Sequence, residues 1–195
     1  MTKGRRSLEF VIRHSSFVIR HSPPHDFARR PTILHYNTRS FSPTVAYRIC
    51  KSFEIESGHM LSKHPEKCRF PHGHTRKVEF VLEAATLDAN EMVCDFKLIK
   101  ELMADFLDGY DHALCMNTED AQYPALKAAY GDRVIGFTAL DPTTEVMAET
   151  IHRYFQARLA ERLAEAAPQY KLRPAVRVVS VRLWETSSSW AEYSE

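Results

Sequence analysis

The sequence predicts an α+β domain, in which a four-stranded antiparallel sheet carries two helices on one face. Apolar and polar residues alternate in segments near 45–55, 75–86 and 177–185, which is the period of half-buried strands. After residue 95 the apolar spacing changes twice to that of amphipathic helices. The resulting order of strand, strand, strand, helix, helix, strand is typical of α+β proteins, whose helices gather on one side of a sheet.

Three of the predicted strands follow directly from this alternation. The apolar residues that carry it are Val45, Tyr47, Ile49, Phe53 and Ile55 in the first strand, Val78, Phe80 and Leu82 in the second, and Val179, Val181 and Leu183 in the last. A turn at 88–90 precedes a further short strand at 92–94. Three strands this close in sequence favour antiparallel pairing. Because such a sheet has open edges, pairing between subunits is one way to cover them.

The two predicted helices have recognisable first residues. Asp95 is a candidate N-cap for the first helix, which should end near Gly109, and Asp141 is a candidate N-cap for the second, with Pro142 in its first turn. The region between them is expected to be a long loop with one short helix near 122–129. The apolar stripes consist of Phe96, Ile99, Leu102, Met103, Phe106 and Leu107 in the first helix, and of Met147, Ile151, Phe155, Leu159 and Leu163 in the second.

The N-terminal segment 1–46 differs in composition from the rest of the chain. The hexapeptide FVIRHS occurs there twice, at 10–15 and 17–22, among very few acidic residues. We therefore expect a low-complexity extension that is disordered or that results from a start codon assigned too far upstream, with a transit peptide as the alternative. The folded domain is placed at 47–195. Four histidines of the extension are excluded from the site: His14, His21, His25 and His35.

Composition narrows the classes of function. A formal net charge of +1 over 195 residues gives no support for binding nucleic acid or a membrane surface. The four cysteines are spread along the chain and lack the density of a disulfide scaffold, which favours a reducing compartment and a cytoplasmic location. No segment approaches the roughly 18 consecutive apolar residues of a membrane span.

The sequence CRFPHGH at 68–74 contains a candidate metal site. Side chains at i and i+2 of a strand share a face, so His72 and His74 can bind one ion. His59, after the first strand, is a candidate third ligand from a neighbouring strand. Three imidazoles with an open fourth position describe a catalytic zinc site. The alternative is that these histidines are unrelated polar surface residues.

Cys68 has three interpretations at this stage. It could be a fourth zinc ligand, which would close the site, or a buried apolar residue, or a nucleophile or base whose pKa is lowered by a neighbouring cation. Spacing does not separate these possibilities. The remaining cysteines have no histidine cluster near them in the sequence and are interpreted as core residues: Cys50, Cys94 and Cys115.

Acidic side chains in three other segments are candidates for chemistry. Asp111 precedes His112 and could fix the tautomer of its ring, or the two could form an ordinary loop pair. Glu185 ends an apolar strand, where it could face solvent or receive a ligand that has paired N–H donors. Glu145 in the sequence PTTE could do the same, or could favour the helix N-terminus through its charge.

Taken in order, these residues resemble the 6-pyruvoyltetrahydropterin synthase and 6-carboxytetrahydropterin synthase family. The similarity covers about three-quarters of the chain. No single motif is decisive, but the ordered set is highly specific. It consists of His59, the C-x-x-x-H-G-H of 68–74, the DF at 95–96, Asp111 with His112, the PTTE at 142–145 and the ETSSSWAEY at 185–193.

The resemblance implies a fold, an assembly and roles for the site residues. The fold would be the tunnelling fold, in which the sheets of three subunits form a barrel and two trimers stack into a homohexamer with sites between subunits. His59, His72 and His74 would bind Zn²⁺, and Cys68 would be the general base. Asp111, His112 and Glu185 would form a proton relay. Thr143 and Glu145 would bind the pterin ring, the carboxylate through a bidentate, charge-assisted contact.

The resemblance also implies an activity. Three residues separate Cys68 from His72, a spacing that resembles that of the bacterial 6-carboxytetrahydropterin synthases. This resemblance implies a zinc-dependent lyase that converts 7,8-dihydroneopterin triphosphate to 6-carboxy-5,6,7,8-tetrahydropterin and releases acetaldehyde and triphosphate. The reaction would be a step toward queuosine and related 7-deazapurines. The alternatives are a 6-pyruvoyltetrahydropterin synthase, another side-chain-cleaving pterin enzyme of this fold, or a zinc-containing binding protein without catalysis. Two features depart from the family pattern, namely Pro71 and the 29-residue gap between His112 and Pro142.

Overall fold

The computed structural model describes residues 46–195 of the chain. The predicted extension at 1–46 lies, apart from Ala46, outside the described residues, and so does Val45 of the first predicted strand. Within the described part of the chain, no helix is long and apolar enough to cross a membrane.

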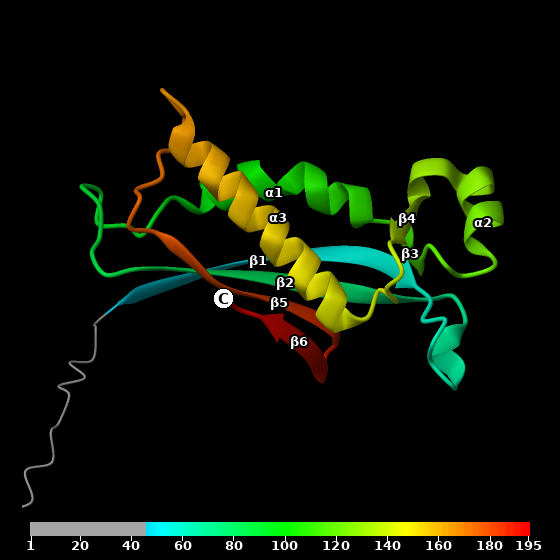
Figure 1. The fold of residues 1–195 in the computed structure, drawn as a ribbon. Coiled ribbons are helices and arrows are strands. Elements are labelled where there is room, and N and C mark those ends of the chain that lie inside the picture. Colours follow the sequence, from blue (N-terminus) through cyan, green and yellow to red (C-terminus); the bar gives the residue numbers. More distant parts are fainter. Residues whose placement is uncertain (1–45) are drawn as a thin grey trace, which may run out of the picture. The chain divides into compact units, whose positions relative to one another are not determined.

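A mixed six-stranded sheet forms one layer of the fold (Figure 1). Its strand order is β4-β3-β1-β2-β5-β6. Antiparallel pairs join β1 to β2, β2 to β5 and β5 to β6, whereas β3 lies parallel to both β1 and β4. The strands are β1 (Tyr47–His59), β2 (His72–Ala84), β3 (Ala113–Asn117), β4 (Val134–Phe137), β5 (Arg177–Thr186) and β6 (Ser189–Tyr193).

The predicted sheet is therefore only partly correct. An antiparallel four-stranded unit exists, but it consists of β1, β2, β5 and β6, and two parallel strands extend it beyond β1. The predicted strand at 92–94 is wrong. The Asp88 carboxylate there accepts hydrogen bonds from the backbone N–H groups of Asn90 and Met92, and Glu91 has a positive φ of 62°. This local turn uses the backbone donors that strand pairing would require.

Three α-helices accompany the sheet. They are α1 (Phe96–Tyr110), α2 (Tyr123–Tyr130) and α3 (Thr144–Ala164), with short 3₁₀ turns at Lys67–Arg69 and Gly131–Arg133. Helices α1 and α3 lie together on one face of the sheet, as predicted (Figure 1). The short helix expected near 122–129 is α2. It lies beside β4, so the region 113–140 contains two strands and a helix where a long loop was predicted.

Of the two predicted helix caps, one is correct and one is wrong. Asp95 caps α1 as predicted, because its carboxylate accepts a hydrogen bond from Lys97 N. The predicted cap of α3 at Asp141 is wrong, since Thr143 occupies that position and its hydroxyl accepts from Val146 N. The Asp141 carboxylate is buried instead and accepts hydrogen bonds from Lys63 N at 2.7 Å and from the side chain of Asn117 at 3.0 Å.

The core lies between the sheet and the helices α1 and α3. The rings of Phe80 on β2 and Phe155 on α3 are both fully buried, with centroids 4.8 Å apart. Two predicted stripe residues are wrong, because Phe96 is 49% exposed and Leu163 is 41% exposed. The register between β2 and β5 shifts at one point, because Val81 lies opposite Ser180 and Leu82 lies opposite Val178, which leaves Val179 without a partner on β2. Val178 is therefore buried in the place that the alternation assigned to Val179.

The aromatic contact between Phe80 and Phe155 should dominate the stability of this layer. We expect Phe155→Ala to lower the free energy of unfolding by about 3–5 kcal/mol, because it leaves a cavity beneath the sheet. Urea unfolding followed by circular dichroism measures the change. Phe96→Ala, which truncates an exposed ring on the neighbouring helix, should change it by only about 0.5 kcal/mol. Equal losses in the two variants would contradict the assignment of the core.

Candidate metal centre and adjoining pocket

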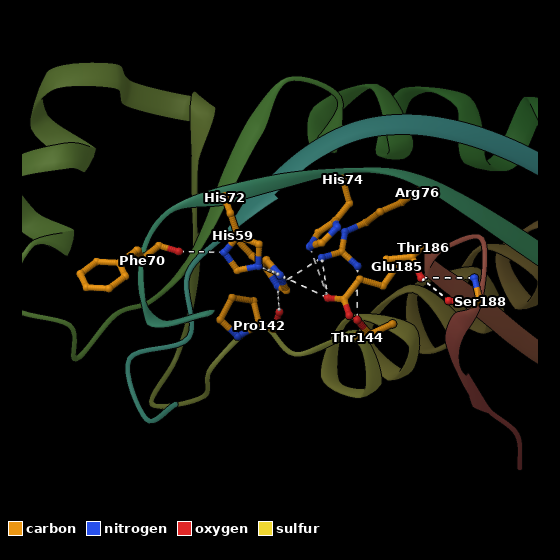
Figure 2. A network of polar contacts seen from close by, with 10 residues as sticks. All are labelled: His59, Phe70, His72, His74, Arg76, Pro142, Thr144, Glu185, Thr186 and Ser188. Carbon is orange, nitrogen blue, oxygen red and sulfur yellow. Dashed lines mark hydrogen bonds and ion pairs between the residues drawn. The ribbon is translucent and has the colours of Figure 1, made fainter. Parts of the chain in front are cut away.

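Three histidines meet at the end of the β1–β2 hairpin (Figure 2). In the antiparallel register His59 lies opposite His72, and Ser57 lies opposite His74. Because alternate residues of a strand share a face, all three imidazole rings point to the side of the sheet that the helices cover. The Nε2 atoms of His59 and His72 are 3.0 Å apart. One possible ligand atom from each histidine lies within 4.8 Å of the others, as the sequence predicted.

Backbone carbonyls fix the tautomers of two of the rings. His59 Nδ1 lies 2.8 Å from Pro142 O, and His72 Nδ1 lies 2.8 Å from Phe70 O. Since a carbonyl oxygen only accepts hydrogen bonds, each Nδ1 carries a proton and donates it. The neutral forms of both rings then have an electron lone pair on Nε2, directed into the cluster. This is the arrangement that positions histidines as metal ligands.

The arrangement of the three Nε2 atoms favours the binding of a cation. Two lone pairs 3.0 Å apart repel each other unless a proton or a metal ion lies between them. A third nitrogen, Nε2 of His74, is buried without a hydrogen-bond partner, and a single proton does not serve three acceptors. Burial, and then the neighbouring Arg76 guanidinium, lower the pKa of His74 and so favour its neutral, ligating form. The residues present thus fit a zinc ion, for which imidazole nitrogens are common ligands.

Cys68 lies outside this set of ligand atoms. It is half-buried in the 3₁₀ turn at Lys67–Arg69, and its carbonyl accepts a hydrogen bond from Leu61 N. Among the described residues, the group of possible ligands within 4.8 Å of one another contains the three histidines and not this cysteine. The geometry favours the interpretations of Cys68 in which it is not a fourth ligand.

The side chains of Glu185 and Arg76 lie directly beside the three histidines (Figure 2). Glu185 Oε1 is 3.3 Å from His59 Nε2 and 3.6 Å from His74 Nε2. A hydrogen bond from His59, which exists only when its Nε2 is protonated, then the charge of Arg76 and a hydrogen bond with Thr144, lower the pKa of Glu185 to about 2. The sequence analysis missed Arg76. The alternation of β2 could have identified this residue, because Arg76 lies two positions before Val78 and therefore on the same, buried face of the strand.

A pocket of about 240 Å³ adjoins the metal centre. It lies between the first turn of α3 and the β5–β6 hairpin, and Thr143, Glu145 and Glu185 line it together with Trp190. The Thr143 hydroxyl already serves as the helix cap, whereas the Glu145 side chain is exposed in the first turn, where its charge suits the helix N-terminus. The structure thus brings the predicted substrate residues to the edge of the histidine cluster. Trp190 was missed by sequence reasoning.

The Asp111–His112 pair has its own contacts within the chain. Asp111 Oδ2 lies 2.8 Å from His112 Nδ1, and its Oδ1 accepts a hydrogen bond from Glu56 N. His112 has a positive φ of 56°, and its N–H donates to Glu56 O. The ring is exposed, and in the described part of one chain its hydrogen bonds do not reach the three histidines. The predicted pairing of the two side chains is present, and the relay with Glu185 stays a prediction.

The fold and this site correspond to a known family of enzymes. Residues 48–195 match the family model described as 6-pyruvoyl tetrahydropterin synthase. The chain belongs to this family.

Curated relatives agree with this assignment. The chain is 32% identical to the 6-carboxy-5,6,7,8-tetrahydropterin synthase of Aquifex aeolicus, over 77% of this chain and 99% of that protein. It is 28% identical to the protein of the same name from Haemophilus influenzae, over 76% of this chain and 99% of that one.

Solved structures share the fold at lower identity. An uncharacterized protein from Wolinella succinogenes has a TM-score of 0.62 at 21% identity, over 77% of this chain and 99% of that one. The 6-pyruvoyl tetrahydropterin synthase of Plasmodium vivax has a TM-score of 0.56 at 14% identity, over 77% of this chain and 98% of that one.

The interpretation of Cys50 as a core residue is wrong, because this residue is exposed on β1. Thiol accessibility distinguishes Cys68 from the two cysteines that are buried, Cys94 and Cys115. Burial raises the pKa of Cys94 to about 11 and that of Cys115 to about 12, so both thiols are protonated and covered at neutral pH. We expect iodoacetamide at pH 7.5 to modify Cys68 in the native protein and to leave these two unmodified until denaturant is added. Peptide mass spectrometry locates each modification. Modification of Cys115 as fast as Cys68 would contradict this placement.

Proposed function

We propose that this protein is a zinc-dependent carbon–carbon lyase. It converts 7,8-dihydroneopterin triphosphate and water to 6-carboxy-5,6,7,8-tetrahydropterin, acetaldehyde and triphosphate. The observation that carries the proposal is the convergence of three imidazole Nε2 atoms beside a pocket that presents the carboxylates of Glu145 and Glu185. The names of the curated relatives support the carboxylated product. The short spacing between Cys68 and His72 supports it as well.

The Glu145 carboxylate suits the recognition of a pterin. Its 2-amino group and ring N–H form a guanidine-like edge, to which a carboxylate binds in a bidentate, charge-assisted manner. The Glu145 side chain is exposed and lines the pocket, so it is accessible for this contact. Thr143 lies beside it and keeps the first turn of α3 in place by capping the helix. The ring would thus be held with its side chain directed toward the histidines.

Proton transfer is assigned to residues around the cluster. His59, His72 and His74 would hold zinc, which lowers the pKa of a bound hydroxyl. Cys68, in the turn that leads into β2, would accept a proton from the substrate side chain. The pKa of Glu185 is lowered, so its carboxylate stays ionised at neutral pH, and in the relay it would stabilise a proton on a neighbouring group by accepting a hydrogen bond from it. Asp111 orients the His112 ring through the contact at Nδ1, which leaves Nε2 for the relay.

We also propose a homohexamer, built as two stacked trimers. β3 reaches β1 only at Ser57–His59, so the outer edge of the first part of β1 has no strand partner among the described residues. Strand β6 is the opposite edge of the sheet. Open edges of this length favour pairing between subunits. The exposed Asp111–His112 pair would then serve the metal centre of a neighbouring subunit.

We place this reaction in the cytoplasm, on the route to queuosine and related 7-deazapurines. The four cysteines of the chain are free, which suits a reducing compartment. The product of the reaction is a carboxylated pterin, the type of precursor that such a route requires.

The activity is tested by incubation with 7,8-dihydroneopterin triphosphate. We expect acetaldehyde and a carboxylated tetrahydropterin by mass spectrometry with wild-type protein. Cys68→Ala should keep bound zinc and lower kcat by about 10²–10⁴-fold, because it removes a base and not a ligand. Zinc content by atomic emission and turnover are measured on the same sample.

Other outcomes separate the remaining functions. A pyruvoyl pterin without acetaldehyde would show the related synthase reaction instead. No turnover by zinc-loaded, folded protein would indicate a binding protein. Equal loss of zinc and turnover in Cys68→Ala would show that the cysteine is a ligand.

Metal binding should stabilise the fold. At a free zinc concentration about 100 times Kd, the free energy of unfolding should rise by about 2.7 kcal/mol, because zinc binds the folded chain and not the unfolded chain. Thermal unfolding with zinc and with a chelator measures this difference. It should disappear in His74→Ala and persist in His64→Ala, because the His64 ring lies in the preceding loop and accepts a hydrogen bond from Glu66 N. A zinc-induced shift that survives in His74→Ala would contradict the assigned ligands.

A further inference from the structure

Arg76 is a buried, charged residue beside the candidate metal centre. It is fully buried and lies two residues after His74, on the same face of β2. Buried guanidinium groups are rare unless their donors and charge are matched by partners. The contacts of this side chain therefore bear on what the site requires.

The donors of Arg76 are only partly satisfied. NH1 donates to the Thr144 hydroxyl at 3.3 Å, and Nε is buried without a partner. NH2 lies 3.2 Å from His59 Nδ1, but that nitrogen already carries the proton that it donates to Pro142 O, so it does not accept. The remaining partner of the guanidinium is the Glu185 carboxylate, with NH2 3.6 Å from Oε1.

One oxygen atom of Glu185 lies close both to Arg76 and to the nitrogens of the candidate metal site. The oxygen that faces Arg76 is the same Oε1 that lies 3.3 Å from His59 Nε2 and 3.6 Å from His74 Nε2. An ion held by these nitrogens would attract this oxygen, since carboxylates are frequent zinc ligands. Bound there, Glu185 would complete a four-coordinate site and leave no position for a substrate.

We propose that Arg76 is a positioning residue that holds the Glu185 carboxylate outside the coordination sphere of the metal, so that the fourth position stays open for a substrate oxygen. The inference rests on the proposed zinc centre. Arg76 does this with NH2 at 3.6 Å from Glu185 Oε1, while NH1 is anchored by Thr144 at the start of α3. Its burial prevents the charge from turning toward water, so the carboxylate keeps a partner that competes with the metal.

A double-mutant cycle on zinc affinity tests this role. The proteins are wild type, Glu185→Gln, Arg76→Met and the double variant, each measured by competition with a chromophoric chelator. If the zinc ligands stay the same, the charges of Arg76 and Glu185 act on the ion additively, and Glu185→Gln causes the same loss of affinity in both backgrounds. We expect the loss to be about tenfold larger in the Arg76→Met background, because the freed carboxylate binds the metal there.

Cobalt substitution provides a readout that a purely structural role would not change. The visible absorption spectrum of the Co²⁺ protein reports its ligands. We expect Arg76→Met to alter this spectrum and the added Glu185→Gln change to restore the wild-type form. The matched control is Lys77→Met, because Lys77 is adjacent, points to the other face of the sheet and pairs with Glu79. Glu185→Gln should have the same effect in this background as in wild type.

The outcomes separate this inference from the proposed function. Wild-type protein that binds no zinc would overturn both the metal centre and the role of Arg76. Equal effects of Glu185→Gln in both backgrounds, with zinc bound throughout, would overturn the role of Arg76 alone. If Arg76→Met does not fold, Arg76→Gln replaces it, because the amide retains a donor for Thr144 without the charge, and the same difference is expected.

Discussion

The pairing of β1 with β2 is the constraint on which the rest of the structure depends. The ladder runs without a shift from Tyr47 opposite Ala84 to His59 opposite His72. Because the side-chain period of a strand is two, a slip by one residue would move every inward side chain to the other face. The core residues on β2 and the histidines belong to the same face, so the hydrophobic contacts with the helices also fix which way the metal ligands point.

Most of this hairpin and its site could be predicted from the sequence. The alternation of Val78, Phe80 and Leu82 assigns the inner face of β2, and His72 and His74 share its parity. The helices were equally accessible, because their stripes and the Asp95 cap depend on neighbours in the sequence. What these patterns predict is local geometry, and here the local geometry determines which side chains converge.

The missed elements depend on tertiary contacts instead. Strand β3 is buried without alternation, and β4 has only four residues, so neither has the period of a half-buried strand. Asp141 has the residue type and position of a helix cap, but its carboxylate is used by Lys63 and Asn117, which are remote in sequence. Arg76 was overlooked for a different reason, because a charged residue is expected to face solvent even where parity places it inside.

The hydrogen bond from His59 Nδ1 to Pro142 O joins residues 83 positions apart in the chain. One ligand thus acquires its final orientation only when the segment before α3 has packed against β1. The isolated hairpin can supply the three imidazole rings, but it lacks the acceptor that fixes this tautomer. If the proposed ion binds here, it would therefore reach full affinity only after α3 has docked, and tight binding would report a chain whose tertiary structure is complete.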